Sequence, residues 1–319
     1  MKHDLKITLA LVLFFVLAQV VGLALIGLDI SEVKVVEGEL TIIHEETSLG
    51  PRPEVRGLGA FAYIAIGVLI GTILVLLIIR MRKINIWKAW FFLAVFIAIS
   101  LALGVLFNNY IALIIALILA IIKVAKPNVF IHNITEVLMY AGIAVFLVPI
   151  LNVFWAAILL IAISVYDFIA VFKSKHMVRM AKFQAKSKVF AGLFIPYTPK
   201  EASLNLNLKA EKSVKPPKEL KAPAPKPPKQ KTQKVQRKNA ILGGGDIAFP
   251  LIFTGVVMES LVVQGMSKTA ALYQSLIITA TTTLALALLF MFAKKDKFYP
   301  AMPIISAGCF LGYIIVLLI

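Results

Sequence analysis

Two aspartates lie inside long apolar stretches of this sequence, Asp167 in SVYDFIAVF and Asp246 in LGGGDIAFP. A carboxylate at the centre of a membrane helix costs about 2.5 kcal/mol or more, so each aspartate needs a specific role. Asp167 precedes Lys173 by about 9 Å of helix, and Asp246 follows Lys238 by about 12 Å. Because both lysines belong to one basic loop, we expect the two carboxyls at a similar depth below one membrane face.

Two carboxyls at close range cannot both ionise cheaply, and they share a proton. The ionised member can take a proton from water while the protonated member polarises a carbonyl, which is general acid–base hydrolysis. Gly243, Gly244 and Gly245 directly precede Asp246, and such a run lets two helix backbones approach closely. Paired carboxylates beside an interrupted helix are also typical of a proton- or sodium-coupled secondary transporter, and these features alone fit a transporter as well as they fit a hydrolase.

A proline-containing run lies at the same expected level, just after Lys297: Tyr299, Pro300, Ala301, Met302 and Pro303. Two prolines leave backbone groups unpaired. Inside a membrane, irregular backbone is tolerated only where protein or a water-filled cavity covers it. The run therefore fits either a substrate-binding element beside the aspartates or a plain helix start, where proline is common.

The composition predicts the elements that must hold these residues. The chain is 60% apolar and 15% charged, whereas soluble domains are roughly half apolar and a quarter charged. A spanning helix needs about 20 mostly apolar residues. We therefore predict an all-α polytopic membrane protein with nine transmembrane helices. The expected spans are residues 5–28, 58–79, 87–107, 110–122, 134–148, 153–172, 240–263, 269–293 and 299–319.

The basic residues predict the orientation, because they are retained on the cytoplasmic side. Segments 2–6, 80–83, 123–126, 173–238 and 294–297 are basic and alternate with acidic or uncharged turns. This alternation predicts a cytoplasmic N-terminus, an extracytoplasmic C-terminus and location in the cell membrane.

Three regions follow from this pattern. Residues 1–172 hold helices one to six with Asp167, residues 173–238 form a cytoplasmic basic loop, and residues 239–319 hold the last three helices with Asp246.

The net charge of +17 arises mainly in that loop, which holds eighteen of the 33 Lys and Arg residues, so it does not indicate nucleic-acid binding. We expect residues 173–199 to form an amphipathic helix on the membrane surface, where anionic lipid favours each lysine by about 1 kcal/mol. Its apolar residues are Met177, Val178, Met180, Phe183, Val189 and Phe190. Residues 200–238 have the composition of a disordered or extended linker.

Three motifs resemble the signatures of one family. Tyr166–Asp167, the glycine run closed by Asp246, and Pro300-Ala301-Met302-Pro303 are similar to the YD, GxGD and PAL motifs of the presenilin and signal peptide peptidase family. The order, the helix placement and the long loop between the aspartates agree as well. One departure is Met302, where the family usually has Leu. Met has a similar volume and is more flexible, so we expect altered substrate preference rather than lost activity.

The resemblance implies an intramembrane aspartyl protease with Asp167 and Asp246 as its catalytic pair. Tyr166 and residues 243–245 would support the site, and residues 300–303 would shape it or bind substrate. The orientation resembles that of presenilin, which implies transmembrane-helix substrates whose N-termini lie outside. The short chain and lysine-rich loop are typical of a prokaryotic, archaeal-like member. The three motifs in order favour the protease over the transporter and over a channel.

The remaining ionisable, cysteine and histidine residues give weaker indications of function. Glu136 and Glu259 lie near expected helix ends, which predicts structural or solvated roles. Cys309 lies in an apolar run as the single cysteine, which excludes an intrachain disulfide. The sequence contains no HExxH motif, and its four histidines are scattered. We therefore expect no metal, no cofactor and no serine–histidine pair.

Overall fold

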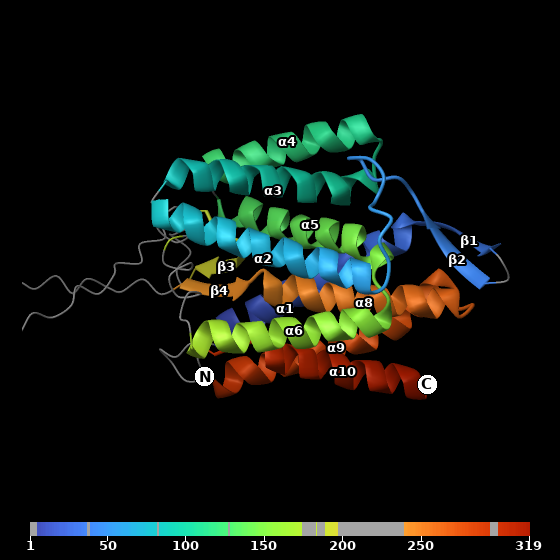
Figure 1. Cartoon of the computed structure of the whole chain (residues 1–319). Coiled ribbons are helices and arrows are strands. Elements are labelled where there is room, and N and C mark those ends of the chain that lie inside the picture. Colours follow the sequence, from blue (N-terminus) through green and yellow to red (C-terminus); the bar gives the residue numbers. More distant parts are fainter. Residues whose placement is uncertain are drawn as a thin grey trace, which may run out of the picture.

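The structure is a computed structural model that describes residues 5–36, 39–81, 83–126, 128–173, 183, 189–196, 239–293 and 299–319. Within this part, nine helices of 17 to 25 residues lie side by side in one bundle (Figure 1). Their bounds are α1 Leu5–Asp29, α2 Leu58–Met81, α3 Ile84–Gly104, α4 Asn109–Ala125, α5 Val129–Leu147, α6 Val153–Phe172, α8 Gly245–Val263, α9 Lys268–Phe292 and α10 Met302–Leu318.

Seven of these helices are long and apolar enough to cross a membrane, and α4 and α10 are shorter apolar helices of 17 residues. The part of the prediction that calls for a largely helical, multi-pass membrane protein is therefore confirmed, but the chain is not all-α, because it also contains four short strands. The count of nine spans and the orientation remain predictions. The chain enters α1 and leaves α10 at opposite ends of the bundle (Figure 1), as an odd number of crossings requires.

Side-chain caps fix where several helices begin. Asn108, Asn128, Asn152 and Ser267 each accept a hydrogen bond from a backbone N–H in the first turn of the helix that follows. These bonds satisfy N–H groups that have no partner within the helix. Asn128 explains why α5 begins at Val129, five residues before the start that apolar patterning predicted.

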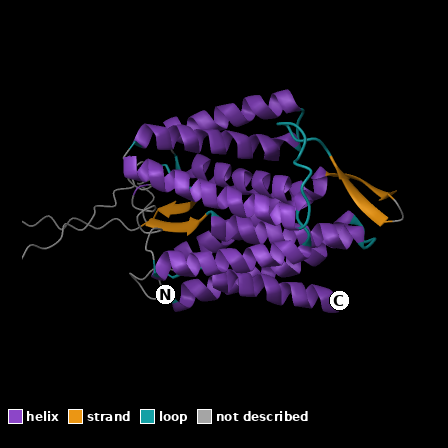
Figure 2. Cartoon of the chain, in the orientation of Figure 1, coloured by secondary structure: helices purple, strands orange, loops and turns teal. Residues whose placement is uncertain are grey.

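Strands lie at both ends of the bundle (Figure 2). β1 (Ile30–Val36) and β2 (Glu39–His44) form an antiparallel hairpin directly after α1. At the opposite end, β3 (Gly192–Pro196) pairs antiparallel with β4 (Asn239–Gly243), and Gly192 lies opposite Gly243.

The predicted start of a helix at residue 240 was wrong, because residues 239–243 form β4. Ala240 and Leu242 are buried whereas Ile241 between them is exposed, which is the alternation of a strand. The three glycines that follow are poor helix formers, so the helix begins only at Gly245.

The predicted surface helix was also wrong over its last residues. Val189 and Phe190 are buried, and the Trp87 Nε1–H donates to the Val189 carbonyl at 3.1 Å. Phe183 is half-buried and packs edge-on against Trp87. Residues 174–182, 184–188 and 197–199 of the predicted surface helix, and the linker 200–238, lie outside the described part.

The buried apolar side chains form two main clusters. The larger one joins α1, α5, α6, α8, α9 and α10, and the smaller one joins α3 and α4 with Val189. Both candidate aspartates belong to helices of the larger cluster.

Candidate active site

Asp167 lies in the last two turns of α6, with its side chain turned into the bundle. The residue is only 6% exposed. The Met302 N–H donates to Asp167 Oδ2 at 3.2 Å, and the Ala301 N–H also donates to this carboxyl. Tyr166, the preceding residue, is 38% exposed and lies mainly on the outer side of α6. The structure thus brings the proline run to Asp167.

The proline run supplies these donors because of where α10 begins. Ala301 is the N-cap residue, Met302 is the first helical residue and Pro303 follows it. The first N–H groups of a helix have no acceptor inside the helix, so they are free to bind a carboxylate. Met302 is 3% exposed, so its side chain helps to cover this end of the site.

Asp246 lies in the first turn of α8, directly after the glycine run. Gly243 ends β4, Gly244 is the N-cap residue and Gly245 begins the helix. A Cβ on Gly243 would lie 3.1 Å from Asp246 Oδ2, and a Cβ on Gly244 would lie 2.6 Å from Tyr140 Oη. A Cβ on Gly245 would be no closer than 3.5 Å to Phe249. The first two glycines therefore leave room for the Asp246 carboxyl and for the Tyr140 hydroxyl.

The helices that carry the two aspartates pack against each other. α6 contacts α8, and α10 contacts both. The hydroxyls of Ser164 on α6 and Ser306 on α10 are hydrogen-bonded at 2.8 Å, one turn from the bond between Asp167 and Met302. The three predicted motifs thus lie on three helices in mutual contact.

A network on α5 that sequence reasoning missed holds the glycine run in place. Glu136 is fully buried and accepts from Lys123 Nζ at 2.6 Å, from the Gly192 N–H at 2.8 Å and from the Tyr140 hydroxyl. Lys123 is also buried. Because Gly192 is paired with Gly243, Glu136 anchors the sheet whose last residue precedes the Asp246 turn.

Two further α5 side chains fix β3. The Asn133 side chain donates to the Phe194 carbonyl at 2.8 Å and accepts from the Phe194 N–H at 2.9 Å. His132 Nε2 lies 2.8 Å from the Gly192 carbonyl oxygen. The polar run His132–Glu136 within an apolar helix was the available sequence signal for this network.

Of the structural or solvated roles predicted for Glu136 and Glu259, the structure excludes the solvated one, because both side chains are buried. Glu259 lies at the opposite end of α8 from Asp246, where its Oε1 is 3.6 Å from His44 Nε2. His44 Nδ1 in turn lies 3.0 Å from Asp29 Oδ2. Glu136 therefore holds the β3–β4 end of the bundle together, and Glu259 lies in a polar cluster at the β1–β2 end.

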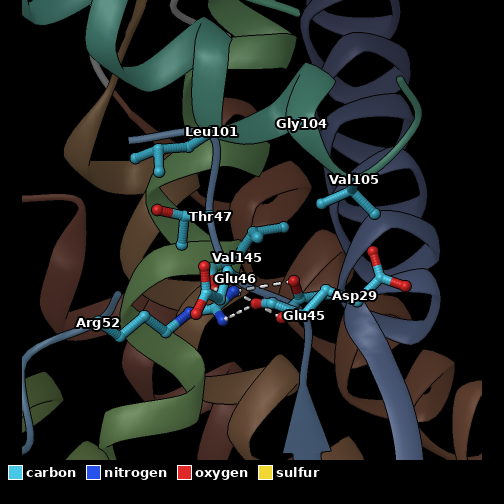
Figure 3. Close-up of a pocket in the computed structure, with 9 residues that line it drawn as sticks. All are labelled: Asp29, Glu45, Glu46, Thr47, Arg52, Leu101, Gly104, Val105 and Val145. Carbon is cyan, nitrogen blue, oxygen red and sulfur yellow. Dashed lines mark hydrogen bonds and ion pairs between the residues drawn. The ribbon is translucent and has the colours of Figure 1, made fainter. Parts of the chain in front are cut away.

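Figure 3 shows a pocket near the β1–β2 end of the bundle, and neither Asp167 nor Asp246 is among the residues that line it. Asp29, Glu45, Glu46 and Thr47 are among the residues that line it. The Arg52 guanidinium donates to both Asp29 carboxyl oxygens, at 2.7 and 2.8 Å. Among the described residues, no three His, Cys, Asp or Glu side chains group closely enough to hold a metal ion.

Comparison with known proteins decides the family. Residues 12–319 match the family described as signal-peptide peptidase, presenilin aspartyl protease. The chain belongs to this family. It is therefore a multi-pass membrane protein of a family of intramembrane aspartyl proteases.

Solved structures agree with this presenilin-family fold. Two structures of a presenilin family intramembrane aspartate protease, in space groups C222 and P2, superpose with TM-scores of 0.55 and 0.58. They are 16% and 17% identical in sequence, covering 96% and 97% of this chain and 94% and 97% of theirs. No curated protein matches the sequence. The presenilin-like fold is thus shown for nearly the whole chain.

Proposed function

We propose that this presenilin-family chain hydrolyses peptide bonds of transmembrane-helix proteins, with Asp167 and Asp246 as its catalytic pair. The observation that carries the proposal is the convergence of the motifs. The first N–H groups of α10 bind the Asp167 carboxyl, and the helix that begins with Asp246 packs on α6. Family membership favours this reading over the secondary transporter.

The pair works by general acid–base chemistry. One carboxylate takes a proton from water as the water oxygen attacks the scissile carbonyl carbon. The other carboxyl donates its proton to the carbonyl oxygen, which gives a tetrahedral diol. Collapse of the diol breaks the C–N bond, the amine nitrogen receives a proton, and the pair returns to its singly protonated state.

A helical substrate hides its peptide bonds in its own hydrogen bonds. We therefore expect local unwinding before cleavage, so that a single-span substrate with a Gly-Pro pair at the cut site is cleaved faster than one with a continuous Leu-rich helix. Equal rates for the two substrates would contradict this step. The basic loop and the charge alternation support cleavage of substrates with outer N-termini, in the cell membrane, with the loop beside anionic headgroups.

The decisive experiment uses the full chain purified in detergent with a single-span substrate. Asp167→Ala and Asp246→Ala are each expected to abolish cleavage while thermal melts show intact folding. Glu259→Gln is the matched control, because it changes the other acid of α8, which is buried at the far end of that helix. Cleavage retained in either aspartate variant refutes the pair, and aspartate-dependent ion uptake into liposomes without any cleavage would establish the transporter.

A further inference from the structure

Gln19 lies near the middle of α1, where its amide side chain is 1% exposed. Its Nε2–H group donates to the Ile247 carbonyl oxygen at 2.9 Å. A carbonyl oxygen can only accept, so the amide nitrogen is the atom that faces it. Ile247 directly follows Asp246 in the first turn of α8. The amide thus joins α1 to the turn that carries the second candidate aspartate.

This turn lies far from both ends of α1. Gln19 is the fifteenth residue of that helix, which places it about 21 Å from the start and about 15 Å from the end at 1.5 Å per residue. At such a depth a backbone group without a partner in its own helix needs one from a neighbouring element, because hydrocarbon offers none. The start of α8 therefore depends on the side chains packed around it.

The first turn of α8 also has one internal donor fewer than a regular helix. Pro250 lies inside the helix and has no N–H to give to the backbone carbonyl four residues earlier, that of Asp246. Gln19 donates to the next carbonyl along the chain. Beyond the proline, the Thr254 hydroxyl donates to the Pro250 carbonyl at 2.9 Å. Side-chain donors thus lie on both sides of the proline, as an interrupted membrane helix requires.

Close packing of α1 on α8 brings the amide within reach of the backbone. A Cβ on Gly22, one turn after Gln19, would lie 2.3 Å from Leu251 Cδ2. On α8, a Cβ on Gly255 would lie 2.6 Å from Ile26 Cδ1. One glycine on each helix therefore lets the two helices approach. The separation of the helices is set by this packing, and the amide then bridges it.

Stability alone does not account for a glutamine at this position. Its Oε1 atom is buried and has no hydrogen-bond partner among the described residues. A buried polar atom without a partner costs at least as much free energy as one ordinary hydrogen bond returns. An apolar side chain of the same shape would therefore fill the space equally well. Departures of this kind are typical of functional sites.

We propose that Gln19 is a positioning residue for cleavage, because its amide holds the Ile247 carbonyl and so fixes the turn that carries Asp246. This inference rests on the proposed function. Gln19 acts through the backbone of α8, and its loss widens the range of positions that the first turn can take. A misplacement of about 1 Å near the reacting atoms lowers a rate by up to about a hundredfold.

The test is Gln19→Met in the full chain, purified in detergent with a single-span substrate. Methionine keeps the length and the apolar contacts of the side chain but removes the donor. We expect kcat to fall about tenfold with KM unchanged, since substrate still binds while the catalytic turn is held less firmly. The melting temperature is expected to stay equal or to rise, because the variant also removes the unpartnered Oε1 atom.

Gln274→Met is the matched control. Gln274 on α9 also donates a hydrogen bond to a backbone carbonyl of a neighbouring helix, that of Val316, at 3.2 Å. Val316 lies near the end of α10 opposite to Met302. This variant is expected to keep the kcat of the wild type. An unchanged kcat in Gln19→Met, or an equal loss in both variants, would overturn the inference.

A second measurement separates the inference from the proposed function. Hydrogen–deuterium exchange over residues 244–251 reports opening of the Asp246 turn without any substrate. We expect exchange there to be about tenfold faster in Gln19→Met, the effect of one lost hydrogen bond, and unchanged over residues 255–263.

If the wild type cleaves nothing, the proposed function fails and the exchange decides alone. Faster exchange over residues 244–251 in Gln19→Met then supports the hold of Gln19 on the turn, and equal exchange overturns it. A Gln19→Met protein that does not fold would show that the amide is purely structural, and it would overturn the inference as well.

Discussion

Replacing Gly244 with alanine tests whether the Asp246 turn is held by contact with α5. The new Cβ would lie 2.6 Å from Tyr140 Oη and 3.0 Å from Cε1 of the same ring. Tyr140 is buried, and its hydroxyl is bonded to Glu136. Because Glu136 is itself held by Lys123 and Gly192, the ring has little freedom to retreat, and the turn must move instead.

The size of the effect follows from the overlap. Ordinary contact begins at 3.4 Å, so the hydroxyl and the Cβ must separate by about 0.8 Å. Overpacking of a well-packed interior costs roughly 1–3 kcal/mol. Replacement of glycine by alanine recovers about 0.4–1 kcal/mol through the unfolded state, because the N-cap φ of −64° suits alanine. The expected net loss is about 1–2 kcal/mol, and a displacement of this size next to Asp246 is expected to lower the cleavage rate by about tenfold to a hundredfold.

The assay is a thermal melt of the purified protein together with single-span substrate cleavage. Gly245→Ala is the matched control, because its Cβ meets Phe249 only at an ordinary 3.5 Å and a helical alanine is more stable than glycine. We expect a lower melting temperature in Gly244→Ala and an equal or higher one in Gly245→Ala. A Gly244→Ala protein as stable as wild type, or a Gly245→Ala protein that is the less stable of the two, would refute the reasoning.

Three other predictions concern packing around the site. Lys123→Met leaves Glu136 as an uncompensated buried charge, so the free energy of unfolding is expected to fall by about 3–5 kcal/mol in thermal or denaturant unfolding. The double variant Lys123→Met/Glu136→Gln is expected to lose less stability. A double variant no more stable than the single one would contradict this. A double-mutant cycle of Ser164→Ala and Ser306→Ala is expected to give a coupling of about 0.6 kcal/mol, and zero coupling would argue against their hydrogen bond. Gly142→Ala places a Cβ 1.8 Å from a backbone carbonyl oxygen of α3, so the yield of folded protein should fall sharply, and normal yield would show that α3 and α5 are further apart.

The sequence by itself determined the helices and the chemistry available to them. Long apolar runs specify membrane helices because hydrocarbon excludes unpaired backbone groups, which is a local requirement. The rarity of charges within those runs made Asp167 and Asp246 stand out. The order of their motifs was enough to indicate the family, which the match over residues 12–319 confirms.

Local patterns failed where the structure depends on distant partners. Residues 239–243 form a strand only because residues 192–196 pair with them, and the intervening chain gives no signal of that register. Glu136 was expected near water, yet its partners Lys123, Tyr140 and Gly192 come from α4, α5 and β3. A buried carboxylate is stable only when such donors surround it.

Tertiary structure alone decided how the candidate site is assembled. Asp167 and Met302 are far apart in the sequence, and their hydrogen bond exists because α6 and α10 pack together. The same packing leaves Asp167 beside an N–H donor at the start of α10, whereas Asp246 follows a glycine turn that lies against the Tyr140 ring. Two identical side chains thus acquire different surroundings, because the sequence fixes which group is present and folding fixes which donors and acceptors face it.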